Sequence, residues 1–81
     1  MDPNIQIQKI NDDVFDVMVR GCRFWLRAAQ LIRDGEGWKV QSRDQFTVSE
    51  EYCGTLDDAL LAGVERAKEN HIYRGTVAGK R

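Results

Sequence analysis

Arg20-Gly21-Cys22-Arg23 separates two segments in which apolar and polar residues alternate, and this stretch decides how the flanking residues pair. A type II′ hairpin turn needs a positive φ at its first central residue, and Gly21 meets that requirement. With Gly21-Cys22 as the turn, apolar residues face one another across two strands: Phe15, Val17 and Val19 against Ala28, Leu26 and Phe24. The alternation therefore predicts strands over about 14–20 and 23–33.

The other surface of this hairpin is cationic and aromatic. It carries Arg20 opposite Arg23, with Met18, Trp25 and Arg27 beside them. Two facing arginines repel each other, and an anionic partner relieves that repulsion. An exposed tryptophan can anchor a protein interface, or offer a ring on which a nucleic-acid base stacks. We take these five residues as the candidate partner-binding site, with an ordinary solvated strand face as the alternative.

The flanking segments extend the hairpin into an antiparallel meander. Residues 4–10 predict a first strand, and Asp34-Gly35-Glu36-Gly37 predicts a reversal before a strand over about 38–48. Arg43-Asp44 bends or breaks that last strand. Placing Ile32 opposite Trp38 continues an even-numbered apolar face: Trp38, Val40, Phe46 and Val48. Leu31 departs from this face, which indicates a β-bulge near Ala29.

Residues 23–34 also admit a helix. On a helical wheel, one arc is apolar and the other is polar, and Ala28-Ala29-Gln30-Leu31 is good helix-forming sequence. We prefer the strand because its register agrees with the glycine turn. The helix is the alternative.

A C-terminal helix is predicted over about 56–70. Thr55 is suited to the N-cap, and Asp58 stands where a capping box places an acceptor. Apolar and small residues then recur at helical spacing, and small side chains allow the helix to lie close to the sheet: Leu56, Ala59, Leu60, Gly63, Val64 and Ala67. We expect an α+β fold in two layers, with three to four strands and one helix, as a single domain over 1–73. Residues 74–81 are expected to form a flexible basic tail.

Composition limits the classes of protein that this chain can represent. Its 81 residues allow one domain, and 42% hydrophobic with 31% charged residues is typical of a globular protein. A net charge of −1 argues against a protein that coats DNA or anionic membranes, although residues 20–45 hold six basic and three acidic residues. No stretch has the pattern of a signal peptide or a membrane span. We expect a cytoplasmic location, no membrane partner, and free thiols at Cys22 and Cys53.

The residues needed for enzyme chemistry are sparse. The single histidine, His71, lies near the expected end of the helix, where a charge–dipole role accounts for it. Adjacent acids point apart on strands, and no phosphate-binding loop is present. One histidine and two cysteines are too few for a structural zinc site. Cys53 precedes a helix N-terminus, which can activate a thiol, but a small buried side chain is preferred. We expect no catalytic residue, metal or cofactor.

One short segment resembles a known family. Cys53-Gly54-Thr55-Leu56-Asp57-Asp58-Ala59-Leu60 is similar to the strand-to-helix junction of HicB-type antitoxins, in which Thr-Leu-Glu-Glu-Ala-Leu opens a helix. The Phe-Pro-Asp-Leu-Pro-Gly-Cys stretch of that family is absent here, so no function is carried over.

Size and element order are similar to those of phage- or mobile-element-encoded regulators and inhibitors, anti-CRISPR proteins among them. A three-stranded sheet on one helix also resembles the DNA-binding arm domains of phage-type integrases. These likenesses concern architecture alone. We therefore expect a small non-enzymatic module that binds a protein through the arginine–tryptophan face. Nucleic acid is the alternative partner.

Overall fold

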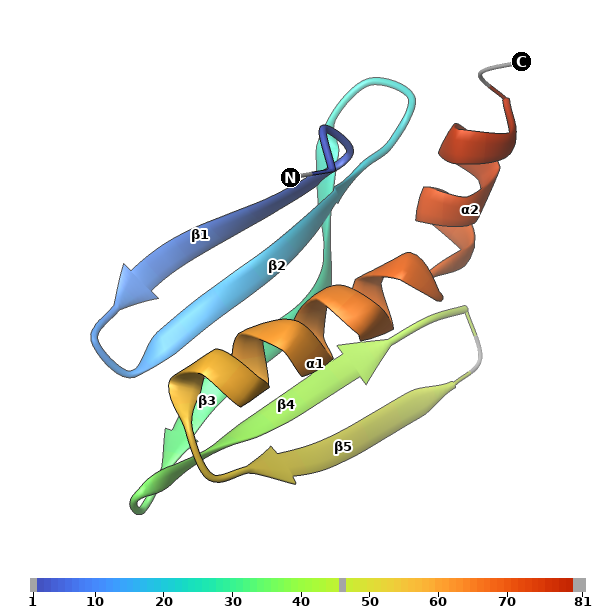
Figure 1. Ribbon diagram of the computed structural model, residues 1–81. Helices are drawn as coiled ribbons and strands as arrows, with labels where there is room; N and C mark the ends of the chain where they lie inside the picture. The colour runs from blue at the N-terminus through green and yellow to red at the C-terminus, as the bar shows by residue number, and fades with distance from the viewer. Residues whose placement is uncertain (1, 46, 80–81) are drawn as a thin grey trace.

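The computed structural model describes residues 2–45 and 47–79, and its secondary structure is a five-stranded antiparallel sheet with two helices (Figure 1). The elements are β1 (Ile5–Asn11), β2 (Val14–Arg20), β3 (Trp25–Asp34), β4 (Gly37–Arg43), β5 (Val48–Cys53), α1 (Leu56–Lys68) and α2 (His71–Ala78). Each strand pairs with the next along the chain, in the order β1-β2-β3-β4-β5. The predicted α+β class is confirmed, with one strand and one helix more than expected. The helical alternative for residues 23–34 is wrong, because β3 occupies most of that segment.

The predicted last strand is in fact two strands. The expected break at Arg43-Asp44 is present, since β4 ends at Arg43 and the chain then reverses into β5. The backbone N–H of Asp44 donates to the carbonyl of Thr47 at 2.8 Å and closes this reversal. The prediction for Phe46 lies outside the described residues. In β5 three polar residues follow Val48, so apolar periodicity alone gave no strand there.

The connection between β2 and β3 is longer than predicted. Arg20 pairs with Trp25, so four residues rather than two join the strands, and the backbone N–H of Gly21 donates to Phe24 at 2.9 Å. Gly21 does not have a positive φ. The glycine that does is Gly35, with φ 64°, at the first of two residues between paired Asp34 and Gly37. The glycine-dependent hairpin turn therefore occurs between β3 and β4.

A β-bulge in the β2–β3 pairing confirms the irregularity expected near Ala29. The register shifts between Val17 and Met18, where Ala28 is the extra residue on β3. After it, Leu31 rather than Ile32 faces the helix side. The prediction that Ile32 lies opposite Trp38 is therefore wrong.

Helix α1 packs on one face of the sheet through small residues, as the sequence predicted. Its buried positions are Ala59, Gly63 and Ala67. A methyl group added at Gly63 would lie 2.9 Å from Leu31 Cδ1 and 3.0 Å from Val17 Cγ2, so the helix backbone rests directly on core side chains. The predicted N-cap is also confirmed. The backbone N–H of Asp58 donates to the Thr55 hydroxyl at 3.2 Å.

The core lies between α1 and the sheet. Its fully buried large side chains are Val17, Val19, Leu31 and Val40. Phe15 and Trp38 meet edge to face with ring centroids 5.6 Å apart, and the Arg33 guanidinium lies 4.8 Å from the centre of the Trp38 ring. Aromatic contacts of this kind close the end of the core near the β3–β4 turn.

Helix α2 occupies much of the segment predicted as a basic tail. Residues 74–81 are helical up to Ala78, and the last two lie outside the described residues. The chain re-enters a helix because the Asn70 side chain accepts a 2.8 Å hydrogen bond from the backbone N–H two residues later. The Thr76 hydroxyl donates to the carbonyl of Arg20 at 2.8 Å, which ties α2 to the end of β2.

Candidate functional site

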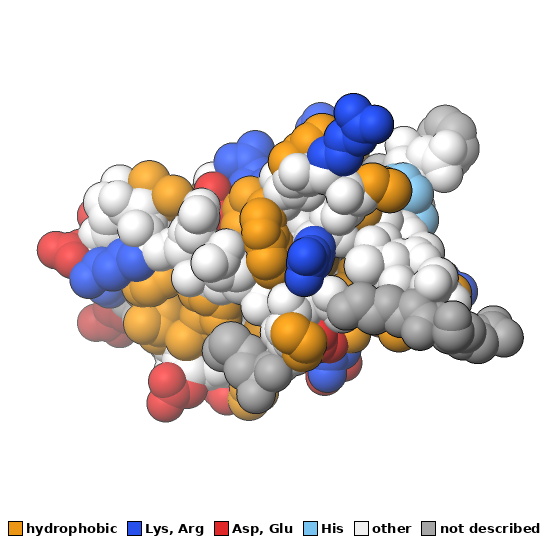
Figure 2. Space-filling view, turned by 90° about the horizontal axis from the view of Figure 1, so that it is seen from above, with side chains coloured by type: hydrophobic (Ala, Val, Ile, Leu, Met, Phe, Trp, Pro, Cys, Tyr) orange, Lys and Arg blue, Asp and Glu red, His pale blue; other side chains and the backbone are white. Residues whose placement is uncertain are grey.

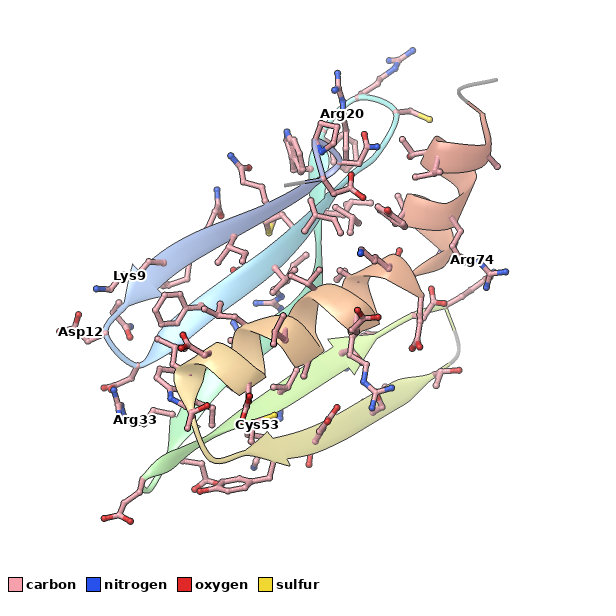
Figure 3. The ribbon with its side chains drawn as sticks, viewed as in Figure 1. Lys9, Asp12, Arg20, Arg33, Cys53 and Arg74 are labelled. Carbon is pink, nitrogen blue, oxygen red and sulfur yellow. The ribbon has the colours of Figure 1, made fainter. Side chains whose placement is uncertain are left out.

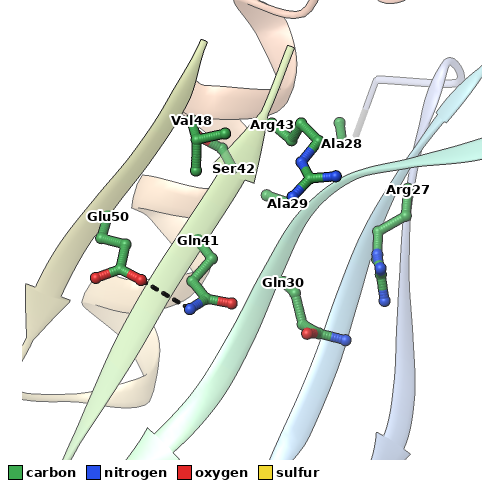
Figure 4. A pocket seen from close by; sticks show the side chains of 9 residues that line it. All are labelled: Arg27, Ala28, Ala29, Gln30, Gln41, Ser42, Arg43, Val48 and Glu50. Carbon is green, nitrogen blue, oxygen red and sulfur yellow. Dashed lines mark hydrogen bonds between the residues drawn. The ribbon is translucent and has the colours of Figure 1, made fainter. Parts of the chain in front are cut away.

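The face of the sheet turned away from α1, called here the open face, carries four of the five predicted site residues. Figure 4 views the sheet from this side, with the helix behind the strands. Arg20 pairs with Trp25 and Met18 with Arg27, and alternation along β2 and β3 directs all four to the same face. Trp25 remains 37% exposed. The structure therefore brings Met18, Arg20, Trp25 and Arg27 together.

Arg23 is the exception. It lies in the four-residue connection rather than on a strand, so it does not face Arg20 as the predicted register required. The charge repulsion inferred for that pair therefore loses its basis, and the case for an anionic partner at this point falls with it. The cause is the longer connection, which moves the pairing by two residues but keeps the alternation of the strand that follows.

Arg27 has a carboxylate beside it. Its Nη1 lies 3.9 Å from Asp16 Oδ1, and the Gln30 side-chain amide donates to the same oxygen at 2.9 Å. The Asp16 side chain is only 14% exposed, whereas that of Arg27 is 56% exposed. The Arg27 side chain is therefore accessible to a partner, and the nearby Asp16 carboxylate partly offsets its positive charge.

A hollow of about 410 Å³ opens on the same face where β3 leaves β4 (Figure 4). The two strands pair only from Ala29 onward, because the bulge at Ala28 bends β3 away. The Gln41 side-chain amide donates to Glu50 Oε2 at 2.9 Å across its floor. The hollow is lined by Arg27, Ala28, Ala29, Gln30, Gln41, Ser42, Arg43, Val48 and Glu50.

Several of these lining residues escaped the sequence analysis. The odd positions of residues 38–43 alternate with the even, apolar ones, and this alternation places Lys39, Gln41 and Arg43 on the open face. That period-2 signal was present in the sequence. The position of Glu50 was not, since it depends on the unpredicted β5.

Two titratable groups with shifted pKa values, Asp44 and Tyr73, take part in contacts that involve α2. His71 follows the end of α1 by three residues, near the helix end as predicted, and is also the first residue of α2; its Nδ1 contacts Asp44 Oδ1. This hydrogen bond lowers the pKa of Asp44 below its ordinary value. The Tyr73 hydroxyl donates to Asp2, and the pKa of Tyr73 is raised by that bond. These contacts fasten α2 to the rest of the chain.

The two cysteines are free and differ in environment. Cys53 is half-buried under α1, near its N-terminus (Figure 3). Burial, followed by the neighbouring carboxylates of Glu51 and Asp58, raises the pKa of its thiol. The environment therefore works against the activated thiolate that a helix N-terminus can favour. Cys22 is exposed in the β2–β3 connection.

Within residues 2–45 and 47–79, no three His, Cys, Asp or Glu side chains gather closely enough to hold a metal ion. Over the same residues, neither helix has the length and apolar character needed to cross a membrane. Comparison with protein-family models, with curated proteins and with solved structures finds no match to this chain.

Proposed function

We propose that this chain is a small, non-enzymatic interaction module that binds a protein partner through the open face. The contact is made by Met18, Arg20, Trp25 and Arg27, with the hollow beside Arg27 taking a protruding side chain of the partner. Such a module acts by occupying a surface of its partner, as a regulator or inhibitor does.

The observation that carries this proposal is the exposed Trp25 on the face of the sheet turned away from α1. Tryptophan and arginine are the residues most enriched among those that dominate protein interfaces. Here Trp25 and Arg20 lie directly opposite each other on neighbouring strands. The rigid sheet holds both without ordering a loop on binding, which keeps the entropic cost of association low.

A nucleic-acid partner is favoured by the charge of the open face. Its strands carry the cations Arg20, Arg27, Lys39 and Arg43 against the acids Asp16, Asp34 and Glu50. Trp25 would then serve as a stacking platform. We rank this second because Asp16 lies beside Arg27 and Glu50 within the hollow. A phosphate backbone would meet both carboxylates.

The test is quantitative affinity capture from the native cell with Trp25→Ala/Arg27→Glu as the bait variant. We expect the affinity for the partner to fall about 30-fold, which is the effect of removing one dominant interface residue. Lys68→Glu/Leu61→Ala is the matched control, because it changes a cation and an exposed apolar residue of α1, away from this face. Equal loss in both variants would refute the assignment.

The two partner classes differ in salt dependence. Binding to nucleic acid weakens steeply as salt rises, because counterions are released from phosphates. A gel-shift assay with DNA and RNA, repeated at low and high salt, therefore separates them. Binding to nucleic acid that disappears with Trp25→Ala/Arg27→Glu would replace the protein partner with the second candidate.

A further inference from the structure

The two edges of the sheet are formed by β1 and β5, and the outer side of β1 has no neighbouring strand. Within residues 2–45 and 47–79, β2 is the one strand that pairs with β1. Ile7 lies opposite Val17, but Ile7 is only half-buried, whereas Val17 is fully buried between two strands. Figure 2 views the molecule from above, which is the side where Figure 1 shows β1. Most of the surface in that view is white or orange, the colours of backbone, uncharged polar and hydrophobic groups.

One hydrogen bond fixes the direction of the backbone groups along β1. The N–H of Arg20 donates to the carbonyl of Asn4 at 2.9 Å, in line with the pairing of β1 and β2. In antiparallel strands, pairs that exchange hydrogen bonds alternate with pairs whose backbone groups point away from each other. The carbonyls of Ile5, Ile7 and Lys9 therefore point outward, as do the N–H groups of Ile7 and Lys9. A further antiparallel strand would use these donors and acceptors.

Charge protects the other edge of the sheet but leaves β1 open. Strand β5 carries Glu50 and Glu51, and a second β5 aligned along its whole length would bring one of them against its own copy. Such charges keep an edge strand from pairing with another chain. Strand β1 has no acidic residue and no proline, and its one lysine, Lys9, is paired with Asp12 at 3.0 Å. Its bulge lies beyond Lys9, so residues 5–9 keep a regular edge.

We propose that this chain forms a two-fold symmetric dimer in which β1 pairs antiparallel with β1 of a second copy. Ile7 then lies opposite its own copy at the two-fold axis, and Gln6 lies opposite Gln8. The outward N–H groups of Ile7 and Lys9 donate to the carbonyls of Ile7 and Ile5 in the second copy. This register opposes no like charges, and the facing glutamine amides can both donate and accept hydrogen bonds.

The symmetry has a consequence for the open face. A two-fold axis that joins antiparallel edges stands perpendicular to the sheet, so both copies present the open face, with Trp25, on the same side. A partner with two equivalent sites would then be bound more tightly than by one copy. The contact is one strand wide and therefore small, so we expect a dissociation constant of about 100 µM for the dimer. The inference does not depend on whether the open face binds a partner.

The first test measures hydrogen exchange of single amides in the full chain at about 10 µM and at about 1 mM. For the expected dissociation constant, the monomer fraction falls about fourfold between these concentrations. Exchange at Ile7 and Lys9 should slow by about the same factor, because their N–H groups become bonded in the dimer. Gln6 and Gln8 are the internal controls, since their N–H groups bond to β2 in both states.

The second test compares Gln6→Lys/Gln8→Lys with Gln6→Glu/Gln8→Lys by sedimentation velocity. The pair differs only at position 6, where the exposed Gln6 lies opposite the uncharged Met18. The net charge of −1 becomes +1 in the first variant and stays −1 in the second, so overall repulsion between copies is equal. Only the first variant opposes like charges in the proposed register. We expect its dissociation constant to be at least about tenfold higher than that of the second.

Four results would overturn the proposal. Exchange at Ile7 that does not depend on concentration would show that the edge stays unpaired. Sedimentation as a monomer up to about 1 mM would exclude the dimer. Equal dissociation constants for the two variants would place the contact between copies on another surface. Species that grow beyond the dimer would show that β1 pairs with β5 of the next copy, a head-to-tail contact that does not close.

Discussion

Replacing Gly63 by alanine measures how closely α1 lies against the sheet. The added methyl group would stand 2.9 Å from Leu31 Cδ1 and 3.0 Å from Val17 Cγ2, closer than carbon atoms normally approach. Both neighbours are fully buried, so neither has open space into which it can turn. The helix or the core side chains must therefore move.

The expected magnitude follows from two opposing effects. Alanine favours a helix over glycine by about 0.5–1 kcal/mol. Extra volume in a well-packed core costs about 1–3 kcal/mol. For Gly63→Ala we expect a net loss of about 1 kcal/mol in the free energy of unfolding. Gly75→Ala is the matched change, since its Cβ meets nothing within 4 Å, and it should gain about 0.5–1 kcal/mol.

The assay is urea unfolding followed by circular dichroism, with the slope of the transition checked for each variant. An unchanged slope means that a shift of the midpoint reports stability. Subtracting the two results cancels most of the helix preference and leaves the packing cost at Gly63. If Gly63→Ala stabilises the protein as much as Gly75→Ala does, α1 does not rest on Leu31 and Val17, and this account of the core is refuted.

Three further predictions concern backbone, charge and thiol chemistry. Gly35→Ala should lower stability by about 1–2 kcal/mol in the same urea assay, because φ of 64° is costly for a residue with a Cβ. The hydrogen bond from His71 lowers the pKa of Asp44 in the folded protein. The ionised Asp44 therefore stabilises the folded state above the ordinary pKa of 3.8, and this stabilisation is lost as the pH falls through the lower pKa of the folded state. Asp44→Asn should therefore flatten the loss of stability between about pH 5 and pH 2, and an unchanged curve would contradict this. Cys22 should react with a thiol reagent before Cys53, whose pKa is raised by burial, and mass spectrometry of the modified protein decides between them.

The features of the fold that depend on neighbouring residues alone could be predicted from the sequence. Thr55 caps the N-terminus of α1 because its hydroxyl accepts a hydrogen bond from a backbone N–H that has no partner within the helix. Every helix N-terminus has such N–H groups, whatever the surrounding tertiary structure. Alternation in β2 is equally local, and it correctly predicted that Met18 and Arg20 lie on one face. An error of two residues in the turn kept the correct face for Trp25 and Arg27, because two is the period of a strand.

The remaining features depend on contacts that short windows do not contain. Arg23 was assigned to the open face because the length of a turn was inferred from one glycine, whereas Gly21 has an ordinary φ. Strand β5 has an acidic segment, and it becomes a strand because β4 offers an edge to pair with. Helix α2 depends on Asn70, which caps it while its amide donates to Arg43 at 3.3 Å, 27 residues away.

Ala28 links the core to the candidate surface. Before this residue, even positions of β3 face the helix, as Leu26 does opposite Val19; after it, odd positions do, as Leu31 does opposite Phe15. One extra residue reverses every side chain that follows, and without it Leu31 would point to solvent. The same insertion bends β3 away from β4, and that bend opens the hollow beside Arg27. The bulge that completes the core therefore also shapes the surface offered to a partner, so a change at Ala28 must alter both.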